Sequence, residues 1–81
     1  MADTLQSYAN LLVSMKQFEK ALPKYDEAIA IRKNEYGNTD QRVLKVMSNK
    51  AMALDYLKRM DDATKLREEI KALEAKAKSG G

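Results

Sequence analysis

Apolar residues recur along this chain at steps of three and four positions, the spacing that places side chains on one face of an α-helix. Four such stretches follow one another, and a short polar stretch separates each from the next. The pattern carries no strand signal. It therefore predicts an all-α fold of four antiparallel helices. The residues predicted to face inward are, helix by helix, Leu5, Tyr8, Ala9 and Leu12; Phe18, Ala21, Leu22, Tyr25, Ala28 and Ile29; Leu44, Met47, Ala51 and Leu54; and Met60, Ala63, Leu66, Ile70 and Leu73.

The ends of the predicted helices carry residues that favour starting or ending a helix. Asp3 or Thr4 is predicted to cap the first helix, because a short oxygen-bearing side chain accepts a backbone N–H that has no partner in the helix. Gly37 is predicted to close the second helix in a left-handed conformation, and residues 38–40 supply the next cap. Pro23 lies inside the second helix, where its missing N–H predicts a kink or a later helix start.

The connections between the helices are short. Residues 14–17 and 58–59 interrupt the apolar spacing, which predicts a tight turn at each place. A chain of 81 residues suffices for a single domain. We assign residues 1–78 to this domain and residues 79–81 to a flexible tail.

The two halves of the chain are similar when one is shifted by 42 residues, which indicates an internal repeat. Small residues recur at equivalent positions, so that two helices of a hairpin can approach closely. The equivalent pairs include Leu5 with Met47, Ala9 with Ala51, Leu12 with Leu54, Phe18 with Met60 and Ala21 with Ala63. One helical hairpin cannot bury its own apolar face, so the second must stack on it. The sequence predicts two stacked hairpins, about residues 4–37 and 40–77.

These positions resemble a known repeat family. Leu5, Tyr8, Ala9, Leu12, Phe18, Ala21, Tyr25 and Ala28 match, in order, the large–small–large pattern of the tetratricopeptide repeat. The 42-residue period and residues 19–32 resemble its longer, kinesin-light-chain-like class. The resemblance implies a fragment of a right-handed α-solenoid.

The sequence departs from that family at four positions. Lys16 and Lys58 stand where the family usually has glycine in the tight turn. Lys50 and Arg67 occupy positions that are usually large and apolar. Polar residues at packing positions are expected in a repeat that caps the end of an array.

Composition excludes most catalytic chemistry. The chain has neither cysteine nor histidine, which removes the thiol nucleophile, the commonest general base and the usual soft-metal ligands. The pairs Asp61-Asp62 and Glu68-Glu69 do not converge, because adjacent helical residues point about 100° apart. We therefore expect no enzyme, no cofactor and no metal site.

Charge and hydropathy bear on whether the chain binds nucleic acid or crosses a membrane. The net charge of +3 is spread along the chain and does not indicate nucleic-acid binding. No apolar run reaches the ~18–20 residues of a membrane span, and the N-terminus does not resemble a signal peptide. We expect a cytoplasmic, or nuclear, protein.

The resemblance implies a protein-interaction module that binds a peptide or a partner helix in a concave groove lined by its first and third helices. Carried over residue by residue, the predicted binding positions are Gln6, Asn10, Val13, Lys45, Ser48, Asn49, Met52 and Tyr56. Asn10 and Asn49 each offer amide donors and an acceptor for a peptide backbone. The alternative is a structural role, either as the end cap of a longer repeat array or through self-association by exposed repeat ends.

Overall fold

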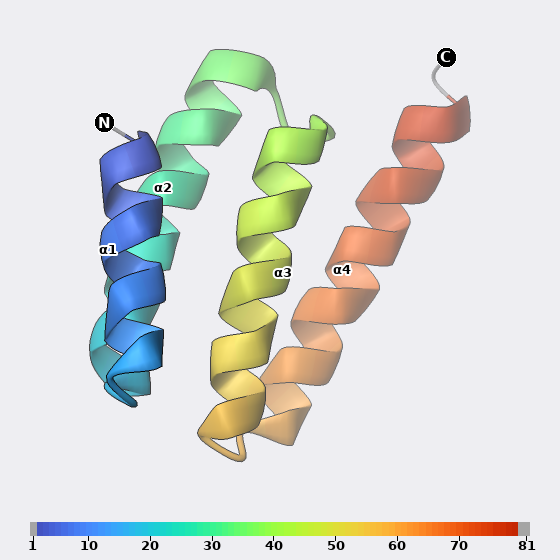
Figure 1. Cartoon of the computed structure of the whole chain (residues 1–81). Helices are drawn as coiled ribbons and strands as arrows, with labels where there is room; N and C mark the ends of the chain where they lie inside the picture. The colour runs from blue at the N-terminus through green and yellow to red at the C-terminus, as the bar shows by residue number, and fades with distance from the viewer. Residues whose placement is uncertain (1, 80–81) are drawn as a thin grey trace.

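A computed structural model describes residues 2–79 of the chain, with the side chains of residues 4–78. Within these residues there are four helices and no strand: α1 (Ala2–Ser14), α2 (Phe18–Tyr36), α3 (Gln41–Tyr56) and α4 (Met60–Ser79). Successive helices run antiparallel and lie side by side in chain order (Figure 1). The structure thus confirms the predicted all-α, two-hairpin fold.

Each hairpin turns through the same local structure. Lys16 and Lys58 have positive φ values of 62° and 61°. The N–H groups that follow each helix bond back onto its last turn, in the paired pattern of a Schellman motif. These bonds run from Lys16 to Val13 (2.9 Å), Gln17 to Leu12 (2.8 Å), Lys58 to Asp55 (2.9 Å) and Arg59 to Leu54 (2.9 Å). The left-handed backbone explains why glycine would suit both positions, and why lysine there is strained.

The connection between the hairpins is built differently. Gly37 has the predicted positive φ of 93°, but its ψ of 166° lies outside the left-handed helical region. Essentially only glycine adopts this extended conformation. The Gly37 N–H still closes α2 by donating to the Lys33 carbonyl at 2.9 Å. Asp40 then caps α3 as predicted, because its side chain accepts the Arg42 N–H at 2.9 Å.

Three details of the helix ends differ from the predictions. The first helix begins at Ala2, before both predicted caps, consistent with the high helix propensity of alanine. The second helix begins at Phe18 and continues through Pro23, so the expected later start is wrong. The last helix includes Ser79, one residue beyond the predicted end of the domain; residues 80–81 of the predicted tail lie outside the described part of the chain.

The core forms where the hairpins meet. Tyr25, Val43, Val46 and Met47 are the largest fully buried side chains. Ala9, Ala21, Ala51 and Ala63 are each 0 % exposed, which confirms the predicted close approach of the helices within each hairpin. Tyr8 and Met60, both predicted to face inward, are 47 % and 57 % exposed.

The sequence predicted too few buried residues in α3. Besides the predicted inward residues, Val43, Val46 and Ala53 are buried. The reason is that α3 contacts α2 on one side and α4 on the other. An inner helix with two neighbours buries a wider face than an outer helix with one.

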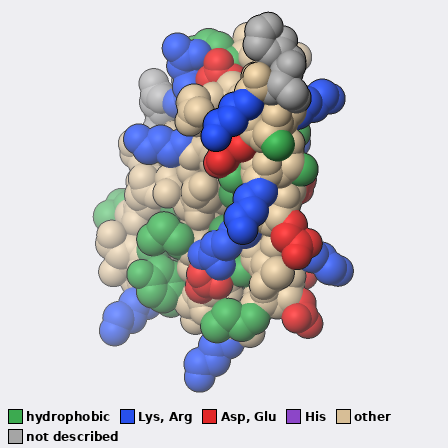
Figure 2. All heavy atoms as spheres, turned by 90° about the vertical axis from the view of Figure 1, so that its right-hand side faces the viewer, with side chains coloured by type: hydrophobic (Ala, Val, Ile, Leu, Met, Phe, Trp, Pro, Cys, Tyr) green, Lys and Arg blue, Asp and Glu red, His purple; other side chains and the backbone are tan. Residues whose placement is uncertain are grey.

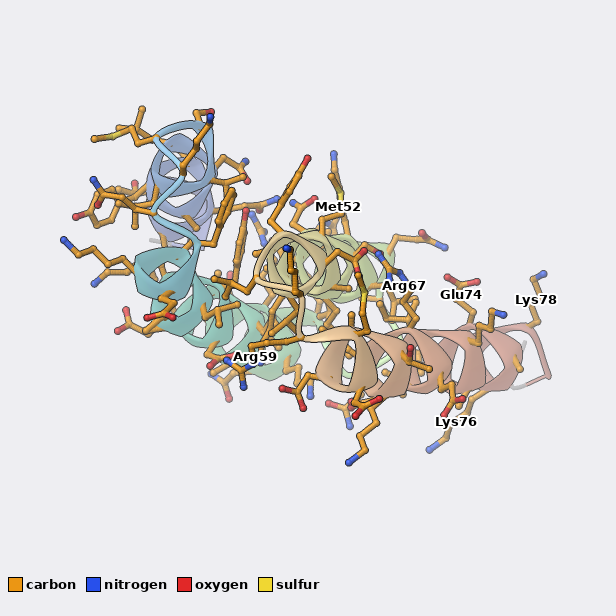
Figure 3. The ribbon with its side chains drawn as sticks, turned by 90° about the horizontal axis from the view of Figure 1, so that it is seen from below. Met52, Arg59, Arg67, Glu74, Lys76 and Lys78 are labelled. Carbon is orange, nitrogen blue, oxygen red and sulfur yellow. The ribbon has the colours of Figure 1, made fainter. Side chains whose placement is uncertain are left out.

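The helices form a thin slab, whose principal extents are 39 × 29 × 14 Å. Seen along the helices, α1 and α3 lie on one side of the molecule and α2 and α4 on the other (Figure 3). This arrangement places α1 and α3, the helices that carry the predicted binding residues, on a common side.

Candidate partner-binding surface

We call the side of the molecule formed by α1 and α3 the α1–α3 face. Met52 points from α3 away from α2 and α4 (Figure 3) and is 49 % exposed. Asn10, Lys45, Ser48 and Tyr56 are also exposed, whereas Gln6, Val13 and Asn49 are half-buried. All eight predicted residues therefore retain accessible surface.

Asn10 is tied to the core. The buried Tyr25 hydroxyl donates to Asn10 Oδ1 at 2.7 Å. This bond satisfies the Tyr25 hydroxyl, and burial raises the pKa of that hydroxyl above its usual range. This bond uses one of the two lone pairs of Asn10 Oδ1. The second lone pair and the amide N–H groups are the positions that Asn10 can present to a partner.

Gln6 and Lys45 are brought together at one end of the α1–α3 face. They share a hollow of about 400 Å³ with three residues that the sequence analysis did not assign to the site. We call it the basic pocket; its lining is Gln6, Arg32, Tyr36, Arg42 and Lys45. Three of these five side chains are cationic and come from two different helices, so the pocket is suited to an anionic group.

Arg42 is held in place within the basic pocket. Its guanidinium lies 4.1 Å from the centre of the Tyr36 ring, a cation–π contact. Its Nη1 atom also lies 3.3 Å from Asp40 Oδ2, so the residue that caps α3 restrains this side chain too. Arg42 thus loses little further side-chain freedom when a ligand binds.

Tyr56 anchors the other end of the α1–α3 face. Its ring stacks on that of Phe18, with ring centroids 4.8 Å apart and planes inclined by 15°. Tyr56 remains 56 % exposed, so the stack fixes the ring and leaves much of it open to a ligand. With the neighbouring Met52, it makes this end of the face apolar.

Ser48 lies apart from the basic pocket. It lines a separate hollow with Glu74 of α4 and with Gln41 and Leu44 of α3. Lys45 lines both hollows. Gln6 and Ser48, which the family resemblance assigned to one groove, thus line two hollows that share Arg42 and Lys45.

Lys50 and Arg67, the polar residues at usually apolar positions, each pair with an acid. Lys50 forms an ion pair with Asp26 of α2. Arg67 makes a two-pronged contact with Asp55 of α3, in which its Nη1 donates to Oδ1 at 3.1 Å and its Nη2 contacts Oδ2. The hydrogen bond from Arg67 lowers the pKa of Asp55. Both pairs link neighbouring helices and replace apolar packing there.

The remaining acidic residues that the structure describes are not grouped as metal ligands. Among residues 4–78, no group of three or more carboxylates is placed to hold a metal ion. Asp62 of the first acidic pair accepts a hydrogen bond from Arg59 Nε at 2.9 Å instead. In the part of the chain that the structure describes, no helix is long and apolar enough to cross a membrane.

Sequence reasoning missed Arg32, Tyr36 and Arg42 because they belong to the end of α2 and the start of α3, outside the helix faces from which binding residues were carried over. In the structure Arg32 is half-buried. The one available signal was the density of cations around the connection between the hairpins, from Arg32 to Lys45.

Comparison with known proteins gives one match. A family model described as tetratricopeptide repeat matches residues 1–75, nearly the whole chain. No curated protein and no solved structure matches.

Proposed function

Because the chain belongs to the tetratricopeptide repeat family, whose repeats generally mediate protein–protein interactions, we propose that its α1–α3 face binds a peptide segment of a partner protein. The observation that supports this most is the basic pocket, where Gln6 and Lys45 of the face meet Arg42 and Arg32. We propose that the module acts by binding alone, without catalysis.

The chemistry of the face suggests which peptide it takes. The basic pocket favours an acidic side chain, and the exposed Met52 and Tyr56 favour an apolar one. Lys45 and Tyr56 are eleven positions apart on α3, which corresponds to about 16 Å at the rise of an α-helix. An extended peptide covers that length in about five residues. We therefore propose a segment with an acidic residue and a large apolar residue about five positions apart.

The peptide backbone would be held between these two ends. Asn49 lies on α3 between Lys45 and Tyr56, and the Asn10 amide on α1 presents its N–H groups. Such amides pair with the donors and acceptors of an extended backbone. Two hairpins offer little area, so we expect a dissociation constant of about micromolar or weaker.

Selection from a random displayed peptide library on the 81-residue chain tests this proposal. We expect enrichment of sequences with the acidic and apolar residues at that spacing. Selected peptides would then be synthesised and their affinities measured by fluorescence anisotropy. Lys45→Ala and Asn49→Ala should each weaken binding about tenfold, in the range of a lost charged or buried polar contact.

Lys71→Ala is the matched control, because Lys71 is an exposed lysine of α4 outside the face. It should leave the affinity unchanged. Selected peptides that bind Lys45→Ala, Asn49→Ala and the unmodified chain equally would show that the α1–α3 face is not the binding surface. The absence of any enriched motif would count against peptide binding altogether.

A further inference from the structure

The basic pocket differs in charge from a hollow of similar size elsewhere in the molecule. A hollow of about 390 Å³ between α2, α3 and α4 is lined by three basic and three acidic side chains, so its charges offset one another. Figure 2 shows the same mixture of basic and acidic side chains over the α4 side of the molecule. The basic pocket has three cationic side chains, and none of the described residues that line it is acidic. Positive charge is thus concentrated at this pocket.

Arg42 keeps one edge of its guanidinium available to a ligand. Asp40 contacts the Nη1 atom alone, with its two carboxylate oxygens at 3.4 and 3.3 Å. The Tyr36 ring meets the guanidinium carbon, 4.1 Å from the centre of the ring. Neither contact is a hydrogen bond from Nε or Nη2. The N–H groups of those two atoms form the edge that binds two oxygens of one anion.

Two further cations lie around the same hollow. Lys45 follows Arg42 by one helical turn on α3, and Arg32 comes from α2. A carboxylate has two oxygens and one charge, which a single guanidinium edge can bind. A phosphorylated side chain has three terminal oxygens and a charge of about −1.5 to −2 at pH 7. Lys45 and Arg32 can bind the third oxygen and the additional charge while the Arg42 edge holds the other two oxygens.

From this geometry we infer that the anion of the basic pocket is a phosphorylated side chain of the partner peptide, so that phosphorylation of the partner controls binding. The inference rests on the proposed function, because the peptide must lie on the α1–α3 face. The phosphorylated residue takes the acidic position, about five residues from the large apolar residue that contacts Met52 and Tyr56. The unphosphorylated partner keeps the apolar contact but leaves the pocket empty, and binds weakly.

A nucleic-acid backbone also carries phosphate, but it fits the α1–α3 face less well. Each phosphodiester has one charge and two unesterified oxygens, so it uses the pocket no better than a carboxylate does. Successive phosphates are bound by successive cations. The far end of the face instead carries the exposed apolar side chains of Met52 and Tyr56. A single phosphomonoester on a peptide with an apolar residue matches both ends of the face.

Three matched peptides test this inference. A peptide from the library selection is synthesised with glutamate, phosphoserine or phosphotyrosine at its acidic position, and each affinity is measured by fluorescence anisotropy at about pH 7.5. We expect one of the phosphorylated peptides to bind at least about tenfold more tightly than the glutamate peptide, as for an added charged hydrogen bond. Equal or weaker binding of both would overturn the inference and leave the proposed function in place, since the glutamate peptide still binds.

Arg42→Gln locates the effect in the pocket. The gain in affinity from phosphorylation should fall to about twofold or less, because the charge and the two-oxygen edge are both lost. Arg59→Gln is the matched control, since Arg59 is also exposed and also pairs with an aspartate, Asp62, outside the pocket. It should leave the gain unchanged. A full gain in Arg42→Gln would overturn the inference.

The pH dependence reports whether the second charge of the phosphate is used. The second pKa of a phosphorylated side chain is about 6, whereas a glutamate side chain has a pKa of about 4.3. The chain has no histidine, the side chain that ordinarily titrates in this range. Between about pH 7 and 5.5 the affinity for the phosphorylated peptide should fall several-fold, and that for the glutamate peptide should not. Identical profiles would overturn the inference.

Small probes separate failure of this inference from failure of the proposed function. Phenyl phosphate and benzoate share a ring and differ in the anion, and nuclear magnetic resonance follows the Arg42 Nε signal as each is added. We expect phenyl phosphate to shift this signal at a lower concentration, and equal responses would overturn the inference. Such a preference without any enriched peptide would reject the proposed function alone. A single-stranded oligonucleotide that displaces the phosphorylated peptide with equal affinity would assign the pocket to nucleic acid and overturn the inference.

Discussion

The two hairpins have the same backbone but are held together by different interactions. In the first, Tyr25 is 2 % exposed and its hydroxyl bonds to Asn10. At the equivalent position of the second stands Arg67, which lies at the surface and pairs with Asp55. The difference follows from position in the stack. Tyr25 is covered by α3, whereas no described helix lies beyond α4, so a polar pair suffices there.

Equivalent positions of the two hairpins can hold either a buried aromatic side chain or a charged one, depending on whether a neighbouring helix covers the position. Burial of a large side chain removes much apolar surface from water and contributes several kcal/mol. A solvent-exposed ion pair contributes little, because water and salt screen it. The covered Tyr25 should therefore contribute more to the stability of the whole chain than the exposed Arg67 at the equivalent position.

The largest predicted effect is the loss of Tyr25. Tyr25→Ala leaves a cavity between the hairpins and should lower the free energy of unfolding by about 3–5 kcal/mol. That is comparable with the total expected for a chain of this size. Arg67→Ala, the equivalent change in the second hairpin, should have little effect. Guanidinium unfolding of both variants measures the difference. Equal losses of unfolding free energy would show that the two positions do not differ in their contribution to stability.

The second effect concerns the joint between the hairpins. Gly37→Ala should destabilise the chain by about 1–3 kcal/mol, because only glycine adopts its backbone conformation without strain. A Cβ atom at this position would meet nothing within 4 Å, so the whole cost is conformational. Thermal unfolding measures it. Asn38→Ala, at the next residue, serves as the control, and an equal loss there would argue against the backbone explanation.

The third effect should be equal in the two hairpins. Lys16→Gly and Lys58→Gly each relieve a left-handed lysine and should stabilise the chain by about 0.5–1 kcal/mol, after the entropy cost of glycine. The double variant should show the sum, since the turns make similar bonds and share no partner. Lys20→Gly, in the interior of α2, should instead destabilise by about 1 kcal/mol. Unequal gains would show that the two turns are not equivalent.

The smallest effects appear in the pH dependence and differ between the hairpins. Burial raises the pKa of Tyr25, so its contribution is complete below the unfolded pKa of about 10 and is lost as pH rises beyond it. Arg67 lowers the pKa of Asp55, so that contribution is present above the unfolded pKa of about 4 and is lost as pH falls through the folded value.

Two substitutions separate these contributions. Tyr25→Phe should flatten the alkaline side of the stability profile, and Arg67→Gln should flatten the acid side. Nuclear magnetic resonance titration of the Asp55 carboxyl should show a higher midpoint in Arg67→Gln than in the unmodified chain. An unchanged midpoint would show that the pair does not persist in solution.

Much of the fold could be predicted from the sequence. Helical spacing located all four helices, and its interruptions at residues 14–17 and 58–59 located the two similar turns. The errors came from packing. Tyr8 has the spacing of an inward residue but no neighbour to cover it, while Val46 and Ala53 are buried because α3 has two neighbours.

The candidate site could be predicted only in part. Resemblance to the family selected residues of the first and third helices, and the structure leaves all eight of them accessible. The resemblance did not select Arg32, Tyr36 and Arg42, because these residues come from helix ends that meet only when the second hairpin stacks on the first. The resemblance also could not show that the Tyr25 hydroxyl donates a hydrogen bond to Asn10 Oδ1, fifteen positions away.

The sequence by itself determined the helices, their turns, the hairpin repeat and the family, because all of these follow from the spacing of apolar and small residues along the chain. Only the tertiary structure decided which charges pair and which cations share the basic pocket. The physical reason is that helical periodicity acts over a few residues, whereas burial and pairing depend on the helix that lies alongside. Asp26 and Lys50, or Asp55 and Arg67, become partners only through that contact.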